Sequence, residues 1–348
     1  MKNDTLSKEA FVVTVQDVAN EAGVSKATVS YVLSNNPLIS EKTANRVREA
    51  MKKLGYSVNH AARALSTSKT KTIAIVAPYL KRNFFSLSRG TYLYALSSAA
   101  REQGYDALLL TGEDGAQLLR DAVDGRKIDG AVFLDVANDD KRIDVAHELN
   151  LPVVLLGRVS DEKEVDFVDT DFEYAAEVFM KKLAGCRHKE IVIVGWPQVQ
   201  YDNKMNYAIR FQQTALYWAN KLGINVRMVY ANNETLGATT EIEEALLTYP
   251  DATALVIHND AAVLSAPQVI RNLELDVPGD ISVVAMVPDQ IATGMKIPYT
   301  SMCINVEEVV EVAVKALVSR MNKPQMDQQA ILVKPRYEDL GSLAMNND

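Results

Sequence analysis

The sequence has 348 residues, 48% of them hydrophobic and 24% charged, which is enough for one small and one larger folded unit. The first residues contain no apolar signal segment, and apolar runs such as residues 73–77 are far shorter than a membrane span. We therefore expect a cytoplasmic chain with no membrane partner. The two cysteines and four scattered histidines have no metal-binding spacing, so we expect no disulfide framework, no metal site and no cofactor.

The net charge of −8 is divided unevenly along the chain. Residues 1–71 contain 11 Lys and Arg against 6 Asp and Glu, a net charge of +5, so the remainder carries −8 − 5 = −13. A basic segment attached to an acidic one is typical of a nucleic-acid-binding unit joined to a second domain. A solvated basic face would give the same count, so the charge alone decides nothing.

Two short helices with a tight turn between them are predicted near the N-terminus. Thr14 is a suitable N-cap for a helix over residues 15–22, which ends at Gly23, where glycine accommodates a left-handed backbone. Ser25 then caps a second helix over residues 26–33. This spacing predicts a helix-turn-helix.

A third helix is predicted from its N-cap Ser40 to Gly55, with apolar residues at helical period. Three short helices can bury one small core. Any three-helix bundle would also fit the spacing alone.

The contiguous run of residues 13–76 resembles the DNA-binding head and hinge of the LacI (lactose-repressor) family. This resemblance implies an operator-binding regulator with a hinge helix. The motifs that carry it are DVA at 17–19, AGVS at 22–25, TVS at 28–30, LGY at 54–56 and the hinge pattern Asn59-x-x-Ala62-Arg63-x-Leu65.

By this resemblance the second helix lies in the major groove and its first turn contacts base edges. Lys26 would donate to guanine, whereas Ala27 would contact only a thymine methyl group. Tyr31 stands where the family usually has arginine, so a bidentate guanine donor is missing. The other residues that we expect at the DNA are Thr14, Val15, Ser25, Thr28, Ser30, Asn35 and Ser40, whose alternative role is local structure such as a helix cap.

Residues 59–68 form a linker that is too short to hold as an isolated helix in water. The resemblance implies that two such hinge helices from a dimer fold together in the minor groove. There Asn59 would contact DNA, Ala62 would pack the helices together, and Leu65 would be the apolar wedge that kinks the duplex. Leu65 could instead cover the surface of the following domain.

From Thr72 onward short apolar runs alternate with helical stretches, a pattern typical of doubly wound parallel sheets. We therefore predict an N-terminal all-α helix-turn-helix domain followed by a two-lobed α/β domain of the periplasmic-binding-protein type, as the family has. The predicted strands cover residues 73–78, 107–111, 130–135, 153–157, 191–195, 227–231, 254–258 and 281–287.

The expected domains are a helix-turn-helix at 13–58, a hinge at 59–70 and a sensor at 71–340. The first lobe would comprise about 71–170 plus 302–328, and the second about 171–300 plus 329–340. The chain would cross between them around 169–172, 296–304 and 325–331, which leaves a hinged cleft between the lobes.

Ligands of such folds bind beyond the carboxyl ends of the strands, so residues there are candidates for an effector site. Arg210 lies on the helix where the family has a ligand-clamping arginine, and Asp289 follows the last predicted strand. The other candidates are Asn83, Phe84, Phe85, Asp135, Asn259 and Asp260.

One departure from the family pattern concerns the ligand. After ISVVA the family continues GFDD, whose first aspartate binds ligand hydroxyls, whereas this chain has Val287 at that position. The lost carboxylate leaves open a sugar bound through Asp289, a larger, phosphorylated or less polar ligand, and a sensor that binds nothing.

The predicted function is that of a ligand-controlled repressor that binds a palindromic double-stranded DNA operator as a homodimer and responds to a sugar or sugar derivative. No leucine repeat follows the closing strand, so a dimer is expected. The helix over 306–320 is a candidate for its surface, and most of the apolar stripe of this helix is equally well explained as core. The alternatives are a solute-binding protein of a transporter, which has no use for residues 13–68, and an α/β enzyme. The chain contains none of the GxSxG, GxGxxG and GxxxxGK[ST] motifs.

Overall fold

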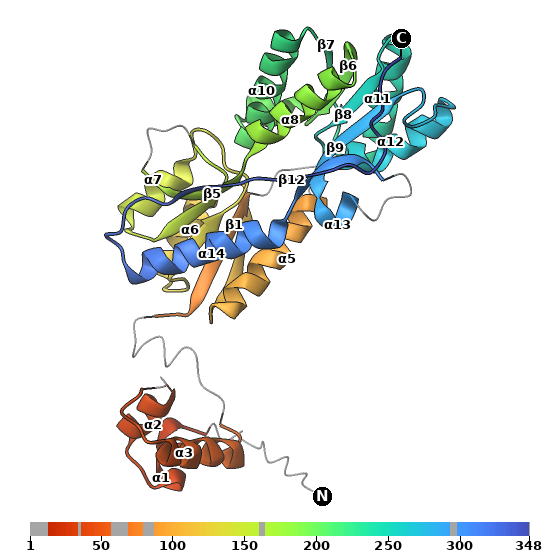
Figure 1. The fold of residues 1–348 in the computed structure, drawn as a ribbon. Helices are drawn as coiled ribbons and strands as arrows, with labels where there is room; N and C mark the ends of the chain where they lie inside the picture. Colours follow the sequence, from red (N-terminus) through yellow and green to blue (C-terminus); the bar gives the residue numbers. More distant parts are fainter. Residues whose placement is uncertain are drawn as a thin grey trace, which may run out of the picture. The chain divides into compact units, whose positions relative to one another are not determined.

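The computed structural model describes residues 13–33, 36–56, 69–78, 87–159, 164–292 and 298–347. The chain divides into two compact units, Met1–Lys69 and Thr70–Asp348, which are taken separately (Figure 1). The predicted hinge residues 59–68 lie outside the described part of the chain.

The N-terminal unit is a three-helix bundle, as predicted. Its helices are α1 (Val15–Ala22), α2 (Lys26–Leu33) and α3 (Glu41–Leu54). Thr14 and Asp17 form a reciprocal capping box at the start of α1, and Gly23 ends that helix with a φ of 61°. The core contains the fully buried side chains of Val18, Ala19, Val29 and Val47.

The larger unit contains two six-stranded sheets, one in each lobe. The strand order is β11-β5-β4-β3-β1-β2 in the first lobe and β12-β10-β9-β8-β6-β7 in the second. Every neighbouring pair is parallel except β10 and β12. The strands are β1 (Thr72–Pro78), β2 (Asp106–Gly112), β3 (Gly130–Phe133), β4 (Val153–Leu156), β5 (Asp166–Thr170), β6 (Glu190–Gly195), β7 (Asn225–Tyr230), β8 (Ala254–Ile257), β9 (Ser282–Pro288), β10 (Thr300–Ile304), β11 (Ala330–Val333) and β12 (Arg336–Glu338).

Helices cover both faces of each sheet, so the central strands are apolar on both sides. Along β1, Ile73 and Ile75 pack toward α5 and α14, whereas Ala74 and Val76 pack toward α6 and α7. The helices of the first lobe are α5 (Leu87–Glu102), α6 (Gly115–Asp124), α7 (Lys141–Glu148) and α14 (Val306–Asn322). Those of the second are α8 (Phe172–Gly185), α9 (Gln198–Asp202), α10 (Asn206–Leu222), α11 (Thr235–Thr248), α12 (Asp260–Asn272) and α13 (Asp289–Ala292).

The lobe boundaries differ from those predicted in the C-terminal region. Strand β10 belongs to the sheet of the second lobe, and β11 pairs with β5 of the first, so the crossings lie at residue 305 and between β11 and β12. The predicted assignment of 302–304 to the first lobe and of 330–333 to the second was therefore wrong. An apolar run such as AILV fits the edge of either sheet, and only its hydrogen-bonding partner decides between them.

The apolar stripe of helix α14 includes Val306, Val310, Ala313 and Leu317 and is buried against the first lobe. Of the two roles that the sequence left open for this stripe, it therefore has that of core. No helix within the described residues is both long and apolar enough to span a membrane, and no cluster of His, Cys, Asp or Glu side chains within them fits a metal ion.

Candidate nucleic-acid interface and interlobe cleft

The surface of α2 contains the residues predicted to read DNA. Val29 and Val32 are buried, while Lys26, Ala27, Ser30 and Tyr31 are exposed, Tyr31 by 50%. An exposed face next to a fixed turn is the arrangement that allows a helix to enter a major groove.

Several polar candidates close to this helix also have structural roles. Ser25 Oγ accepts from the backbone nitrogen of Thr28 at 3.1 Å, and Ser40 Oγ accepts from that of Thr43 at 3.4 Å. Thr14 caps α1, and Val15 begins it half-buried. A DNA contact by any of them stays a prediction. Asn35, Asn59, Ala62 and Leu65 lie outside the described residues.

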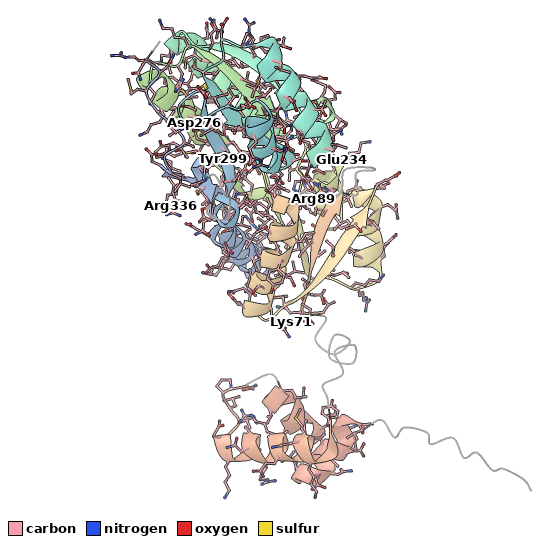
Figure 2. All side chains as sticks on the ribbon, turned by 90° about the vertical axis from the view of Figure 1, so that its right-hand side faces the viewer. Lys71, Arg89, Glu234, Asp276, Tyr299 and Arg336 are labelled. Atoms are coloured by element: carbon pink, nitrogen blue, oxygen red, sulfur yellow. The ribbon has the colours of Figure 1, made fainter. Side chains whose placement is uncertain are left out.

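A cavity of about 150 Å³ lies between the two lobes of the larger unit. Residues that follow the strand ends line it, as expected for parallel sheets. Figure 2 shows Arg89 on the side of the first lobe that faces the second. The lining residues used below are Ser88, Arg89, Asp135, Asp169, Phe172, Trp196, Gln200, Tyr207, Asn233, His258, Asn259, Asp260, Met286 and Pro288.

Two predicted candidates line this cavity with their carboxylates held in place. Asp135 has a left-handed backbone with a φ of 50°, and its Oδ2 lies 2.6 Å from a guanidinium nitrogen of Arg89. Asp260 accepts from the backbone nitrogen of Ser88 at 3.1 Å and from Ser88 Oγ at 2.7 Å. The Ser88 contact joins α5 of the first lobe to α12 of the second.

Asn259 lines the cavity, but its amide group is used inside the protein. Its Nδ2 donates to the carbonyl oxygens of Gly195 and Ala231 at 3.1 and 3.0 Å, and its Oδ1 accepts from the backbone nitrogen of Ala262. Asn259 therefore caps α12 and ties it to β6 and β7.

Two other candidates are not among the lining residues. Arg210 donates to Glu173 Oε1 at 3.2 Å and to the carbonyl oxygen of Val159 at 3.4 Å, and Asp289 lies 3.6 Å from Arg336. Each therefore pairs with a neighbouring charge, and a ligand contact by either side chain stays a prediction. Asn83, Phe84 and Phe85 lie outside the described residues.

The side chain of Val287 does not face the cleft. It is buried in the core of the second lobe, while its neighbours Met286 and Pro288 line the cavity. The cavity nevertheless contains the three carboxylates of Asp135, Asp169 and Asp260. Sequence reasoning missed Asp169, which lies at the end of β5. Val287 therefore does not make the cavity free of acidic groups, because other segments of the chain supply them.

Aromatic side chains that the sequence did not single out form one wall of the cavity. The ring centroids of Trp196 and Tyr207 are 5.1 Å apart at 75°, and Phe172 lies 5.6 Å from His258. Burial lowers the pKa of His258 to about 3, so its ring is neutral. Ring faces suit an apolar ligand surface, whereas Trp196 also offers its N–H.

A second set of contacts between the lobes, called the seam below, is formed by Asn138, Arg158, Glu173, Lys204 and Asn206. Asn206 Nδ2 donates to the carbonyl oxygen of Arg158 at 2.5 Å, and the backbone nitrogen of Asn138 donates to the carbonyl oxygen of Lys204 at 3.1 Å. Glu173, on α8 of the second lobe, accepts from Arg158 of the first and from Arg210 of its own lobe. These contacts hold α10 against the loops that follow β3 and β4.

Asp169 adjoins this seam and is fully buried. Burial raises its pKa to about 7 and Glu173 adds to that effect, although Arg158 and Arg210 act to lower it. Its Oδ2 lies 3.9 Å from Arg158 Nε and has no hydrogen-bond partner among the described residues. Asp169 therefore connects the cavity to the charged seam.

Comparison with known proteins agrees with this two-part architecture. A model of "Bacterial regulatory proteins, lacI family" matches residues 14–59, and one of the "Periplasmic binding protein-like domain" matches residues 180–342. The chain thus has a LacI-type DNA-binding domain and a periplasmic-binding-protein-like domain. The sequence resemblance is thus confirmed, and the chain is a transcriptional regulator.

Members of the LacI family from several bacteria are similar to the chain. Catabolite control protein A of Priestia megaterium is 27% identical over 338 residues, which is 94% of this chain and 98% of that protein. The transcriptional regulator MalR of Streptococcus pneumoniae is 36% identical over 197 residues, 53% of this chain and 57% of MalR.

Solved structures share the fold. The lac repressor dimer bound to operator and the anti-inducer ONPF has a TM-score of 0.77 at 21% identity. The complex of the regulator CelR with cellobiose has a TM-score of 0.68 at 24% identity. Each alignment covers 95% of this chain and 99% of the other, and the LacI fold predicted from sequence is confirmed.

We predict that the stability of the larger unit depends on pH through Asp169. Its pKa in the folded protein lies above the ordinary aspartate value of 3.8, so the stabilisation is complete below about pH 4 and is lost as the pH rises through 7. Asp169→Asn removes this dependence, worth about 1.4 kcal/mol for each unit of pKa. Both tryptophans, Trp196 and Trp218, lie in this unit, so their fluorescence follows its melting.

The measurement compares melting temperatures from pH 5 to pH 8. The melting temperature of the wild type should fall relative to that of Asp169→Asn as the pH rises. The control is Asp124→Asn, which changes an exposed aspartate on α6, and its difference from the wild type should stay constant with pH. A constant difference between wild type and Asp169→Asn would show that Asp169 is ionised throughout this range.

Proposed function

We propose that this LacI-family regulator is a repressor that binds a palindromic operator in double-stranded DNA as a homodimer, under the control of a sugar or sugar derivative. A single observation carries the proposal. A helix-turn-helix with an exposed second helix is joined to a two-lobed unit whose cleft contains a polar and aromatic cavity. The regulator acts in the cytoplasm, where its operator is, and is not an enzyme.

The DNA-reading residues follow from the exposed face of α2. Lys26 is a donor that suits guanine O6 and N7, Ala27 suits a thymine methyl group, and Tyr31 replaces a bidentate guanidinium by one hydroxyl. Leu65 from each protomer would wedge the central base step, with Ala62 between the two hinge helices.

The cleft supplies the effector site. Carboxylates and amides next to ring faces suit the hydroxyls and apolar faces of a sugar. The structure of the relative CelR holds cellobiose, which supports a sugar as the effector class. A thermal-shift screen of sugars, sugar phosphates and nucleobases with the full-length protein tests this class, because a ligand that binds only the folded state raises its melting temperature. A hit among the nucleobases alone would indicate a non-sugar effector, and no hit would contradict a sugar effector.

Each lobe exposes large apolar side chains that suit a second copy of the chain. In the first lobe these are Tyr94 on α5, 83% exposed, and Leu109 on β2. In the second they are Leu236 on α11, 82% exposed, and Leu264 on α12, close together because Ser265 Oγ donates to the carbonyl oxygen of Thr235. In Figure 1, α5 lies on the same side of the unit as α11 and α12. Such exposed apolar groups mark an association surface.

We predict that Lys26→Ala weakens binding to the operator by roughly 10-fold or more, the discrimination expected of a good base contact. The operator is first selected from random duplexes with the full-length protein, and affinities are then measured by fluorescence anisotropy at several salt concentrations. Lys52→Ala, which changes an exposed lysine of α3, is the control. An equal loss on operator and random DNA would mean that Lys26 contacts only phosphate.

We predict that Leu236→Asp shifts the protein from dimer to monomer in sedimentation velocity, because a charge cannot be buried unpaired at an interface. Tyr217→Asp, at an exposed aromatic residue of α10, should remain dimeric. A monomeric Tyr217→Asp with a dimeric Leu236→Asp would place the interface on the opposite side of the unit.

A further inference from the structure

One carboxylate holds the two residues that begin the larger unit. Asp129 Oδ1 accepts from the backbone nitrogen of Thr70 at 2.7 Å and from Thr70 Oγ1 at 2.9 Å. Asp129 Oδ2 accepts from the backbone nitrogen of Lys71 at 2.9 Å. The backbone nitrogen of Asp129 also donates to the carbonyl oxygen of Thr72 at 2.9 Å. Both carboxylate oxygens of one side chain therefore bind the segment just before β1.

The backbone of Lys71 is left-handed, with a φ of 56°, which is uncommon for a residue other than glycine. Its nitrogen donates to Asp129, and its carbonyl oxygen accepts from the backbone nitrogen of Asp106 at 2.8 Å. Its ammonium group lies 4.3 Å from the centre of the Tyr105 ring. A costly backbone conformation persists where the surrounding contacts determine it, and such sites are often functional.

These contacts order a turn that lies outside the paired part of the sheet. The pairing of β1 with β2 begins at Thr72, and its pairing with β3 begins at Ile73. Ile73 is also the first buried apolar residue of this unit, whereas Thr70 and Lys71 are half-buried. The core and the strand pairing therefore do not fix the turn, and the side chain of Asp129 does.

The turn lies where the chain passes from one unit to the other. The boundary between the two compact units falls between Lys69 and Thr70. Figure 2 shows Lys71 at the end of the first lobe that is remote from the second lobe. Asp129 therefore fixes the point at which the chain leaves the sensor toward the DNA-binding unit.

A fixed exit matters for a dimer that reads two half-sites at once. Helix-turn-helix dimers bind half-sites whose centres are roughly 34–36 Å apart or a multiple of this distance. Once one half-site is bound, the second binds intramolecularly, and this gain is lost when the geometry forbids both. A chain that left the sensor with free backbone dihedrals could reach several spacings. A fixed turn favours one spacing, because less conformational freedom is lost on binding there.

We propose that Asp129 determines which half-site spacing the dimer binds, by fixing the turn at Thr70 and Lys71. The inference rests on the operator-binding dimer proposed above and adds to it a specificity determinant that lies in the sensor. Asp129 is a positioning residue, which acts through the chain and not through a contact with DNA. Helix α2 reads the bases of each half-site, and Asp129 restricts the distance between the two half-sites.

The test uses the full-length protein and the operator selected from random duplexes. Fluorescence anisotropy gives the affinity for this operator and for duplexes in which one or two base pairs are inserted or removed between the half-sites. Wild type should bind the altered duplexes about 10-fold or more weakly than the operator, because one half-site is lost. Asp129→Ala should bind the operator about 10-fold more weakly than wild type and should discriminate little between spacings.

Two further variants accompany Asp129→Ala. Asp129→Asn keeps one acceptor oxygen for Thr70 and replaces the other by an NH₂ group, which cannot accept from Lys71, so its spacing discrimination should be intermediate. Asp124→Ala changes an exposed aspartate of the preceding helix α6 and should behave as wild type. The fluorescence of the two tryptophans, both in the larger unit, shows the temperature at which each variant is folded. If Asp129→Ala does not fold, Asp129→Asn decides.

The readout separates a positioning role from a purely structural one. An anchor that only stabilised the sensor would change the melting temperature and leave the spacing preference as in wild type. Wild-type discrimination in folded Asp129→Ala or Asp129→Asn, or an equal loss of affinity at every spacing, would therefore overturn the inference and leave the operator-binding dimer standing. A wild-type protein that bound all spacings equally would also overturn it. Failure of the wild type to select any operator would contradict the proposed function itself.

Discussion

The three passages of the chain between the lobes are the constraint on which the sensor unit depends. The chain crosses after β5, after β10 and between β11 and β12, so the lobes can rotate about these connections but cannot separate. The carboxyl ends of the parallel strands then face one another across the cavity. Asp135 follows β3, Asp169 lies in β5, Trp196 follows β6 and Asn233 follows β7, so their place on the strands puts all four at the cavity.

The same geometry links an effector to DNA in the proposed mechanism. A ligand shifts the rotation of the lobes only as far as its affinities for the open and closed forms differ. The closed form depends on Ser88 with Asp260 on one side and on Arg158 with Glu173 on the other. In this mechanism an effector bound in the cavity stabilises one form over the other, and a coupling of roughly 1–3 kcal/mol would change operator affinity about 5–150-fold.

Sequence reasoning found the elements that local signals define. The caps at Thr14 and Ser40 and the glycine at 23 placed the three N-terminal helices, and apolar runs placed eight strands. Position after a strand correctly placed Asp135 and Asp260 at the cavity. Sequence reasoning missed Asp169, because it lies in a strand, DFVDT, whose mixed polarity gave no signal. The pairing of Arg210 with Glu173 and the burial of Val287 in the core depend on neighbours in space, which local sequence does not give.

The contacts of Glu173 with Arg158 and Arg210 hold the two lobes together in this mechanism, and a distance measurement tests this directly. Spin labels attached through unnatural ketone side chains at Asp124 of the first lobe and Glu244 of the second report the separation of the lobes by double electron–electron resonance, in protein diluted with unlabelled chains. The control is Glu177→Gln, because Glu177 pairs only with Lys181 of its own helix among the ion pairs of the described residues. Wild type and Glu177→Gln should give the same narrow distribution of distances. Glu173→Gln should broaden it toward other distances, and a distribution identical to that of the wild type would contradict the account.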